Sequence, residues 1–216
     1  MKLASLTLAS GMVLFTGVSQ AATTITFEQV PSYISSISNA YNGGTNALGA
    51  SGPNYGISFS ASAVSLANDG LGNGPNGEYF SNAPSGNVVM LDIDGTSFMN
   101  MAIGFVGTAS FGYASDVAAV GAVKIWSGLG GTGTQLASFD LAGNSATGCA
   151  VAGPYCNFNV LSTAFSGVAY SMTFGGNAGA VLFDDITVTA VPEASTWLTM
   201  LAGLGAIGFM RRRASK

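Results

Sequence analysis

The sequence predicts an all-β protein organised as a single antiparallel β-sandwich, and two observations lead to this fold class. Short apolar runs are separated by glycine- and asparagine-rich spacers such as Asn42-Gly43-Gly44 and Asn68-Asp69-Gly70, which favour tight turns and interrupt helices. No amphipathic helical pattern occurs between residues 23 and 190. Many short strands joined by such turns are typical of two packed sheets.

Roughly nine strands are expected in this part of the chain. In residues 168–174 the large apolar side chains occupy every second position, as in a strand with one face buried. The expected strands cover residues 24–28, 55–66, 87–93, 101–106, 109–114, 117–127, 134–140, 168–174 and 180–189. Phe105, Phe111 and Tyr113 are assigned to the core between the sheets. Strands of this number and length favour a jelly-roll or galactose-binding-like topology.

The first 21 residues have the pattern of a secretory signal peptide. Lys2 precedes an apolar stretch, and the small residues Ser19 and Ala21 stand where a signal peptidase reads the chain. Cleavage is expected after Ala21, with signal peptidase as a partner during export. The domain organisation is then a signal peptide at 1–21, a sandwich domain at 22–190 and a separate terminal segment at 191–216.

The terminal segment has three parts in a fixed order. Val191, Pro192 and Glu193 come first, followed by an apolar stretch over 196–210 and a basic cluster over 211–216. The apolar stretch is at the short limit for crossing a bilayer of about 30 Å. The basic cluster is expected to stay cytoplasmic, so that the sandwich domain faces outward.

These residues resemble the carboxy-terminal signal of PEP-CTERM proteins. The match comprises Val191, Pro192 and Glu193, the apolar stretch and the arginines; it departs from the family pattern at Ala194, where the family has a second proline. The resemblance implies processing by an exosortase in the inner membrane of a Gram-negative bacterium that makes exopolysaccharide. It further implies a transient membrane anchor that is removed during sorting, and a final location at the cell surface or in the extracellular matrix.

Composition excludes several function classes. The chain has 216 residues, six basic and ten acidic, and no histidine, so a Ser-His-Asp triad, a Cys-His pair and imidazole metal ligands are impossible. Within residues 22–190 nine acidic residues accompany a single base, Lys124, which gives a net charge of −8. Nucleic acid is excluded as a partner because no cationic surface exists to displace its counterions, whereas a divalent cation fits this balance.

Cys149 and Cys156 are the two cysteines of the sequence. In an exported chain they are expected to form a disulfide across a turn at Gly153-Pro154. A redox-active pair is the alternative, although the spacing is not Cys-x-x-Cys. The predicted disulfide is a structural staple.

The run from Phe183 to Val188 places two adjacent carboxylates, Asp184 and Asp185, in an apolar strand, where a charge requires a partner. This run, together with Glu28 in the first strand, is similar to sugar-binding jelly-roll modules. The resemblance implies one structural Ca²⁺ held by Glu28 and Asp184, with Asp185 as a further ligand and backbone carbonyls completing the shell. Ordinary hydrogen bonding at a solvated strand end is the alternative.

Asp92 and Asp94 form a second acidic pair, which alternation places on one face of the strand over 87–93. Two glycosidase carboxylates stand on opposite sides of the sugar, roughly 5–10 Å apart, whereas these two share a strand face. The full calcium-loop spacing is also absent. A glycosidase or polysaccharide lyase that uses Asp92, Asp94 or Glu78 is nevertheless an alternative function.

Trp126 is the candidate for sugar contact. Val123 and Ile125 share one parity in the strand over 117–127 and are assigned to the core, so Lys124 and Trp126 face the other way. An outward indole ring can stack on a pyranose; packing beneath a neighbouring loop is the alternative. The predicted function is an exported, non-catalytic protein of the surface or exopolysaccharide matrix that binds carbohydrate weakly. A purely structural or adhesive matrix protein is the remaining alternative.

Overall fold

The computed structural model describes residues 22–68, 79–147, 155–176, 178–191 and Leu204. The described residues form ten strands and one short 3₁₀ helix, so the all-β prediction is confirmed. The strands are β1 (Ala22–Ile25), β2 (Tyr33–Ser36), β3 (Ile57–Phe59), β4 (Ala63–Ala67), β5 (Val88–Asp92), β6 (Ser97–Ser115), β7 (Ala119–Trp126), β8 (Gln135–Leu141), β9 (Asn159–Phe174) and β10 (Val181–Ala190), with the helix η1 (Leu129–Gly131) between β7 and β8.

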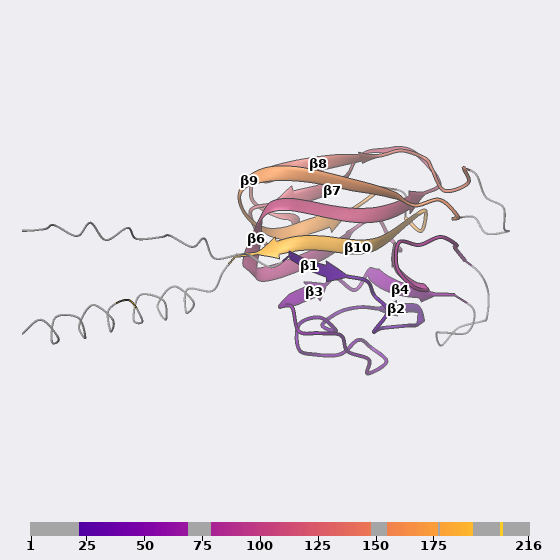
Figure 1. The fold of residues 1–216 in the computed structure, drawn as a ribbon, viewed down its shortest axis with the longest axis horizontal. Coiled ribbons are helices and arrows are strands. Elements are labelled where there is room, and N and C mark those ends of the chain that lie inside the picture. The colour runs from indigo at the N-terminus through magenta and orange to yellow at the C-terminus, as the bar shows by residue number, and fades with distance from the viewer. Residues whose placement is uncertain (1–21, 69–78, 148–154, 177, 192–203, 205–216) are drawn as a thin grey trace, which may run out of the picture.

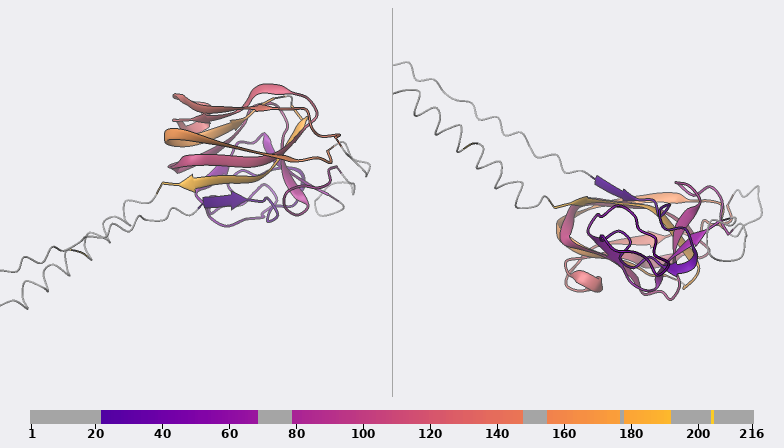
Figure 2. Two further views of the ribbon diagram at one scale, coloured as in Figure 1. Left: turned by 45° about the horizontal axis from the view of Figure 1, so that its top comes forward. Right: turned by 90° about the horizontal axis from the view of Figure 1, so that it is seen from below.

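All ten strands pair in one antiparallel sheet that folds over into a sandwich. The order along the sheet is β2-β4-β5-β10-β6-β9-β7-β8, with β1 added to β10 and β3 added to β6. Figure 1 shows β7, β8 and β9 on one side of the molecule and β1 to β4 on the other. The two views of Figure 2 show the same arrangement, with the start of β1 beside the end of β10.

Strand β10 has a central position because one of its edges serves two different partners. Leu182 and Phe183 pair with β5, whereas residues 186–189 pair with β1, so β5 and β1 lie end to end along this edge. Asp184 and Asp185 lie where the partner changes. At the same point the pairing of β10 with β6 shifts register, and Asp185 adopts φ +48°. The two carboxylates therefore lie at a bulge between two strand ends.

The core lies between the layers and is rich in aromatic side chains. Phe111 packs edge-on against Phe139 and Phe183, with ring centroids 4.9 and 5.7 Å apart. Phe105 and Phe111 are fully buried and Tyr113 nearly so, as predicted. Edge-to-face rings of this kind add to the free energy that their buried area contributes.

Several strand boundaries differ from the prediction. The expected strands 101–106 and 109–114 are one long strand, β6, which continues through two glycines of positive φ, Gly104 and Gly107. The expected strand 55–66 is two strands, β3 and β4, separated by a turn. β2 was not predicted, and β9 begins nine residues before the expected 168.

The predicted alternation in residues 168–174 holds only in its second half. Met172 and Phe174 enter the core, but Val168 is 37% exposed and Ala169 is buried instead. The pairing of β9 with β6 shifts register between Ser171 and Ala169, and this irregularity turns the side chains over to the other face.

Some predicted features lie outside the described residues. These are the signal peptide at 1–21, Glu78, Cys149, Pro192, Glu193 and the apolar stretch at 196–210. Within the described ranges no helix is long and apolar enough to cross a membrane. Cys156 is buried, and its backbone N–H donates to the carbonyl of Ser145 at 2.8 Å. The disulfide stays a prediction.

Candidate functional site

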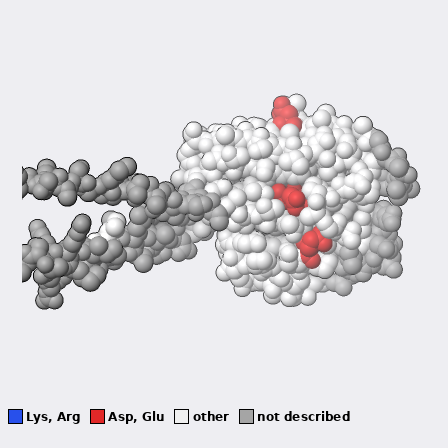
Figure 3. All heavy atoms as spheres, in the orientation of Figure 1, with Lys and Arg blue, Asp and Glu red and all other residues white. Residues whose placement is uncertain are grey.

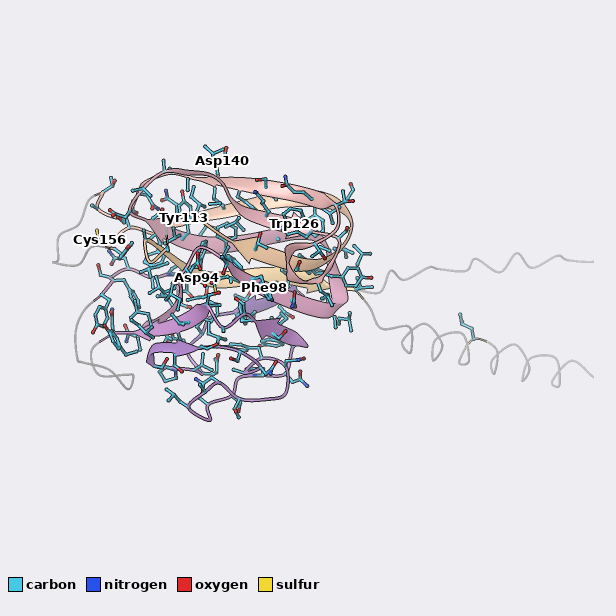
Figure 4. All side chains as sticks on the ribbon, turned by 180° about the vertical axis from the view of Figure 1, so that it is seen from behind. Asp94, Phe98, Tyr113, Trp126, Asp140 and Cys156 are labelled. Carbon is cyan, nitrogen blue, oxygen red and sulfur yellow. The ribbon has the colours of Figure 1, made fainter. Side chains whose placement is uncertain are left out.

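The candidate site is a groove with a volume of about 530 Å³ on the outer face of β6, β9 and β7. We call it the Trp126 groove. Trp126 and Phe98 contribute rings from β7 and β6, and both are labelled in Figure 4. Its lining consists of Gly95, Thr96, Ser97, Phe98, Gly121, Ala122, Lys124, Trp126, Gly130, Gly131, Thr173, Phe174, Gly175 and Gly176.

Strand register brings the functional side chains of the groove together. Thr173 on the middle strand pairs with Phe98 on one side and Lys124 on the other. Ser171, two residues earlier, pairs with Asn100 and Trp126 in the same way. Directly paired residues share a sheet face, so these side chains form two adjacent rows on the outer surface.

The η1 segment folds over the second of these rows. The N–H of Gly130 donates to Oδ1 of Asn100 at 2.7 Å, and the N–H of Gly131 donates to Oγ of Ser171 at 3.0 Å. Oγ of Ser171 in turn donates to the carbonyl of Gly128 at 2.5 Å. These bonds fix the segment as one wall of the groove.

Trp126 lies partly under this wall and partly in the groove. Its Nε1 donates to Oγ1 of Thr173 at 3.0 Å, which satisfies the polar edge of the indole within the protein. Gly131 stands directly above: a Cβ at this position would lie 2.6 Å from Cγ2 of Thr173, and the residue has φ +74°. The outward orientation predicted for Trp126 and Lys124 is confirmed, and Val123 and Ile125 are fully buried. The alternative, in which Trp126 packs beneath a neighbouring loop, describes the side of the ring that contacts the η1 segment.

Charge in the groove is confined to one side chain. Among the described residues that line it, Lys124 is the charged one. Asp94 and Asp140 lie on adjoining segments, where Asp94 accepts from Thr96 and Asp140 accepts from the N–H of Gly121 at 2.7 Å. The opposite face, drawn in Figure 3, shows a few separate acidic groups on an otherwise uncharged surface.

A second cluster forms where β1 and β5 meet along β10, and we call it the carboxylate junction: Glu28, Asp184 and the segment 85–88. Asp184 accepts from the N–H of Ser85 at 2.9 Å and from its hydroxyl at 3.1 Å. Glu28 accepts from the N–H of Val88 at 2.8 Å and of Asn87 at 3.1 Å. The structure thus brings Glu28 and Asp184 to one short segment, although they are far apart in the sequence.

Burial dominates the electrostatics of the carboxylate junction. It raises the pKa of Asp184 to about 7, despite the N–H donors of Ser85 and Asp185, which act in the opposite direction. Burial is also the first cause that raises the pKa of Tyr41, followed by the nearby Tyr55, Glu28 and Asp184. Burial therefore favours the neutral forms of both the phenol of Tyr41 and the carboxyl of Asp184.

The fit of this junction to Ca²⁺ is partial. Oxygens of Glu28 and Asp184 accept backbone N–H groups, as in the hydrogen-bonding alternative; Asp184 is fully buried, whereas Glu28 is partly exposed. Oδ1 of Asp185 is buried without a partner and is the free acceptor. No group of three or more acidic or cysteine side chains converges as metal ligands within the described residues. The calcium site stays a prediction.

The acidic pair Asp92 and Asp94 does not share a strand face. β5 ends at Asp92, whose carboxylate is buried and accepts from the hydroxyl of Ser97 at 2.6 Å and from the N–H of Gly95 at 3.1 Å. Asp94 follows in the turn, is exposed, and its pKa is lowered first by the hydroxyl of Thr96. The expected placement was wrong because alternation stops where the strand ends.

Sequence reasoning missed Thr96, Phe98 and Thr173 as parts of the groove. They belong to β6, β9 and the loop before β6, and only the pairing of these strands makes them neighbours of Trp126. It also missed the segment 85–88, which binds both carboxylates of the junction. Its one local signal is Gly86, whose φ of +46° and contact with Glu28 leave no room for a side chain.

Comparison with solved structures gives distant likenesses. A family 6 carbohydrate-binding module is 16% identical over 74% of this chain and 96% of that chain, with a TM-score of 0.39. The K2 cleaved adhesin domain of Lys-gingipain is 13% identical over 79% of this chain and 99% of that chain, with a TM-score of 0.44. No curated protein matches the sequence.

The end of the sandwich leads directly into the sorting segment. β10 ends at Ala190, and the N–H of Val191 donates to the carbonyl of Gly104 at 3.0 Å, which ties the first motif residue to β6. Residues 190–214 match the PEP-CTERM protein-sorting motif, so the resemblance predicted from the sequence is confirmed. The motif implies processing by an exosortase. The chain therefore carries a PEP-CTERM sorting motif and is an exported protein that is sorted via the membrane.

Proposed function

We propose that this protein is a non-catalytic module of the bacterial cell surface or exopolysaccharide matrix, and that its Trp126 groove binds carbohydrate weakly. The observation that carries the proposal is the position of Trp126, whose ring lines an outward groove beside the hydroxyl-bearing residues Thr96 and Thr173. Its polar edge is satisfied by Thr173, so the ring offers an apolar surface to a ligand.

The groove has the size and chemistry of a small-molecule site. Its volume of about 530 Å³ lies within the roughly 300–1,000 Å³ typical of ligand sites. Sugars present an apolar ring face edged by hydroxyl groups, and the lining supplies aromatic rings, hydroxyls and glycine backbone in the same small area. Binding at one open, shallow aromatic platform is expected to be weak.

The carboxylates support a binding role over catalysis. Asp92 is buried, and its Oδ1 accepts from Gly95 and Ser97, whereas Asp94 is exposed and held by Thr96. A glycosidase needs two carboxylates that can reach opposite sides of one sugar bond. Glu78 lies outside the described residues.

The export route completes the proposal. Signal peptidase removes residues 1–21, the segment 196–210 anchors the chain transiently in the inner membrane, and an exosortase then releases it to the surface. Pairing of Ala22 with Thr189 places both ends of the sandwich side by side, so a single end of the domain faces the membrane during sorting.

The test is retention of polysaccharides by the purified chain in affinity electrophoresis, followed by measurement of released sugar. Trp126→Ala is expected to abolish retention, whereas Val160→Ala, at an exposed position on β9, is expected to leave it unchanged. Released sugar that disappears in Asp92→Asn would favour an enzyme. Absence of retention, combined with loss of biofilm cohesion in a deletion strain, would favour a structural or adhesive protein.

A further inference from the structure

We propose that the Trp126 groove selects saccharides that carry a carboxylate, as uronic acid residues do, and that Lys124 is the residue that recognises this group. The inference rests on the proposed function, since it assumes that the groove binds sugar. It adds the chemical class of the ligand, which neither the sorting motif nor the fold specifies.

The first argument is the placement of charge. Residues 22–190 contain nine acidic residues and one base, and that base lies in the groove beside the aromatic ring. A lysine that served only solubility would not need this position, because the acidic residues already give the domain a net charge of −8. The described lining presents the positive charge of Lys124 to a bound anion and contains no carboxylate that would repel it.

The second argument is the orientation of Lys124. A Cβ built on Gly121 would lie 3.4 Å from Cε and 4.0 Å from Nζ of Lys124, so the ammonium group lies along the glycine wall of the groove. Gly121 has φ +61° and lacks a side chain that could cover the ammonium. The nearby carboxylate of Asp140 already accepts the N–H of Gly121.

The third argument is spacing. Lys124 and Trp126 are two residues apart on β7 and lie on the same face, which separates their Cα atoms by about 7 Å. An exocyclic carboxylate of a pyranose ring stacked on Trp126 is therefore within reach of the lysine. Thr173, which pairs with Lys124 and bonds to Trp126, lies between them with its hydroxyl available as an acceptor or donor.

The negative charge of the domain does not cancel this local attraction. Charges farther apart than about 8 Å are screened at physiological ionic strength, so a ligand in the groove responds mainly to Lys124. Asp94 and Asp140, on the segments that adjoin the groove, repel an anion and reduce this attraction. The expected gain is that of one exposed ion pair, a few-fold in affinity.

The experiment compares oligogalacturonate with its methyl ester, which keeps the sugar chain and removes the charge. Binding to the full chain in detergent is measured by calorimetry at low and high salt. We expect the acid to bind about three- to fivefold more tightly than the ester at low salt, with the difference reduced at high salt. Lys124→Gln should remove the difference between acid and ester.

Two further variants separate the possible results. Lys124→Gln combined with Val160→Lys restores the net charge at an exposed position near the other end of β9, and it should not restore preference for the acid. Restoration would overturn the proposal, as would equal binding of acid and ester by the unaltered chain.

Trp126→Ala should weaken the binding of both ligands. If the ester binds through Trp126 without any preference for the acid, the selectivity alone fails; if neither ligand binds, the proposed carbohydrate binding fails as well.

Discussion

At the scale of single residues, Asp184 shows how burial sets the protonation of a carboxyl group. It is fully buried, and its acceptors are satisfied by Ser85 and by its own neighbour Asp185. These bonds favour the carboxylate, but loss of hydration favours the acid more strongly, and the pKa rises to about 7. The ionised group is therefore a source of instability at neutral pH in the metal-free protein.

The pH dependence of stability follows from this shift. Because the pKa of Asp184 is raised on folding, its contribution is complete below about pH 4, the pKa of an unfolded aspartate, and is lost as the pH rises through about 7. In the presence of chelator, unfolding by urea should show a free energy that falls by up to about 1.4 kcal/mol per pH unit within this window. Asp184→Asn should flatten the profile there; an equally steep profile in the variant would contradict the assignment.

Bound Ca²⁺ would reverse the direction in which stability changes with pH. A cation at the carboxylate junction favours the ionised form of Asp184, so its binding should be stronger at pH 8 than at pH 5. If the predicted site exists, added Ca²⁺ should raise the melting temperature at pH 8, and Asp184→Ala should abolish the response. An identical melt with Ca²⁺ and with chelator would remove Glu28, Asp184 and Asp185 as ligands.

Gly86 occupies a position where both the backbone conformation and the neighbouring Glu28 require glycine. A Cβ there would lie 2.1 Å from Cδ of Glu28, and φ is +46°. Gly86→Ala should destabilise the protein by roughly 1–3 kcal/mol or more in denaturant unfolding. Gly49→Ala is the matched control, because Gly49 also has positive φ (+83°) but nothing lies within 4 Å of the added carbon. A similar loss in both variants would show that backbone strain alone accounts for the effect.

At the scale of elements, the prediction succeeded where hydrophobic alternation is regular. β5, β7, β8 and β10 lie close to the predicted ranges, and the parity of Val123 and Ile125 gives the buried face of β7. It failed where glycines or bulges interrupt the alternation. The predicted gap between two strands at 107–108 contains Gly107, although β6 passes through both Gly107 and Gly104 with positive φ.

The site was less predictable than the fold. Trp126 and Lys124 could be assigned outward from their own strand, and Glu28 and Asp184 from a resemblance. The remaining groove residues come from strands whose neighbours are set by the order β6-β9-β7, which local sequence does not encode. The hydrogen-bond donors to the two carboxylates come from the segment 85–88, where Ser85 is 99 residues from Asp184 and Val88 is 60 residues from Glu28, so tertiary packing alone joins them.

The side chains of Asn100 and Ser171 hold the η1 segment in position. Oδ1 of Asn100 accepts the N–H of Gly130 and holds the segment against β6. Asn100→Ala should speed hydrogen exchange at Gly130 and weaken glycan binding, because the wall beside Trp126 is loosened. Asn54→Ala, which removes a similar bond to the N–H of Gly56, should leave Gly130 unaffected. Unchanged exchange at Gly130 in Asn100→Ala would show that Ser171 is sufficient to hold the segment.

At the scale of the whole molecule, the sandwich and the sorting segment are mechanically connected. β1 and β10 pair along residues 22–25 and 186–189, so the strand that precedes the sorting motif lies beside the first strand of the domain. The bond from Val191 to Gly104 extends this connection to β6. Folding of the sandwich therefore fixes the point from which the motif emerges.

Processing at this point is the last prediction. Pro192→Ala combined with Glu193→Ala alters the motif residues within the match at 190–214 and leaves the described strands untouched. Because recognition by an exosortase requires the motif, the variant should accumulate in the membrane fraction at the mass of the uncleaved form, as measured by fractionation and mass spectrometry. Val160→Ser, an exposed change outside the match, should mature as the unaltered chain does. Normal release of the double variant would mean that another part of the sorting segment directs processing, because the sandwich is identical in the double variant and the unaltered chain.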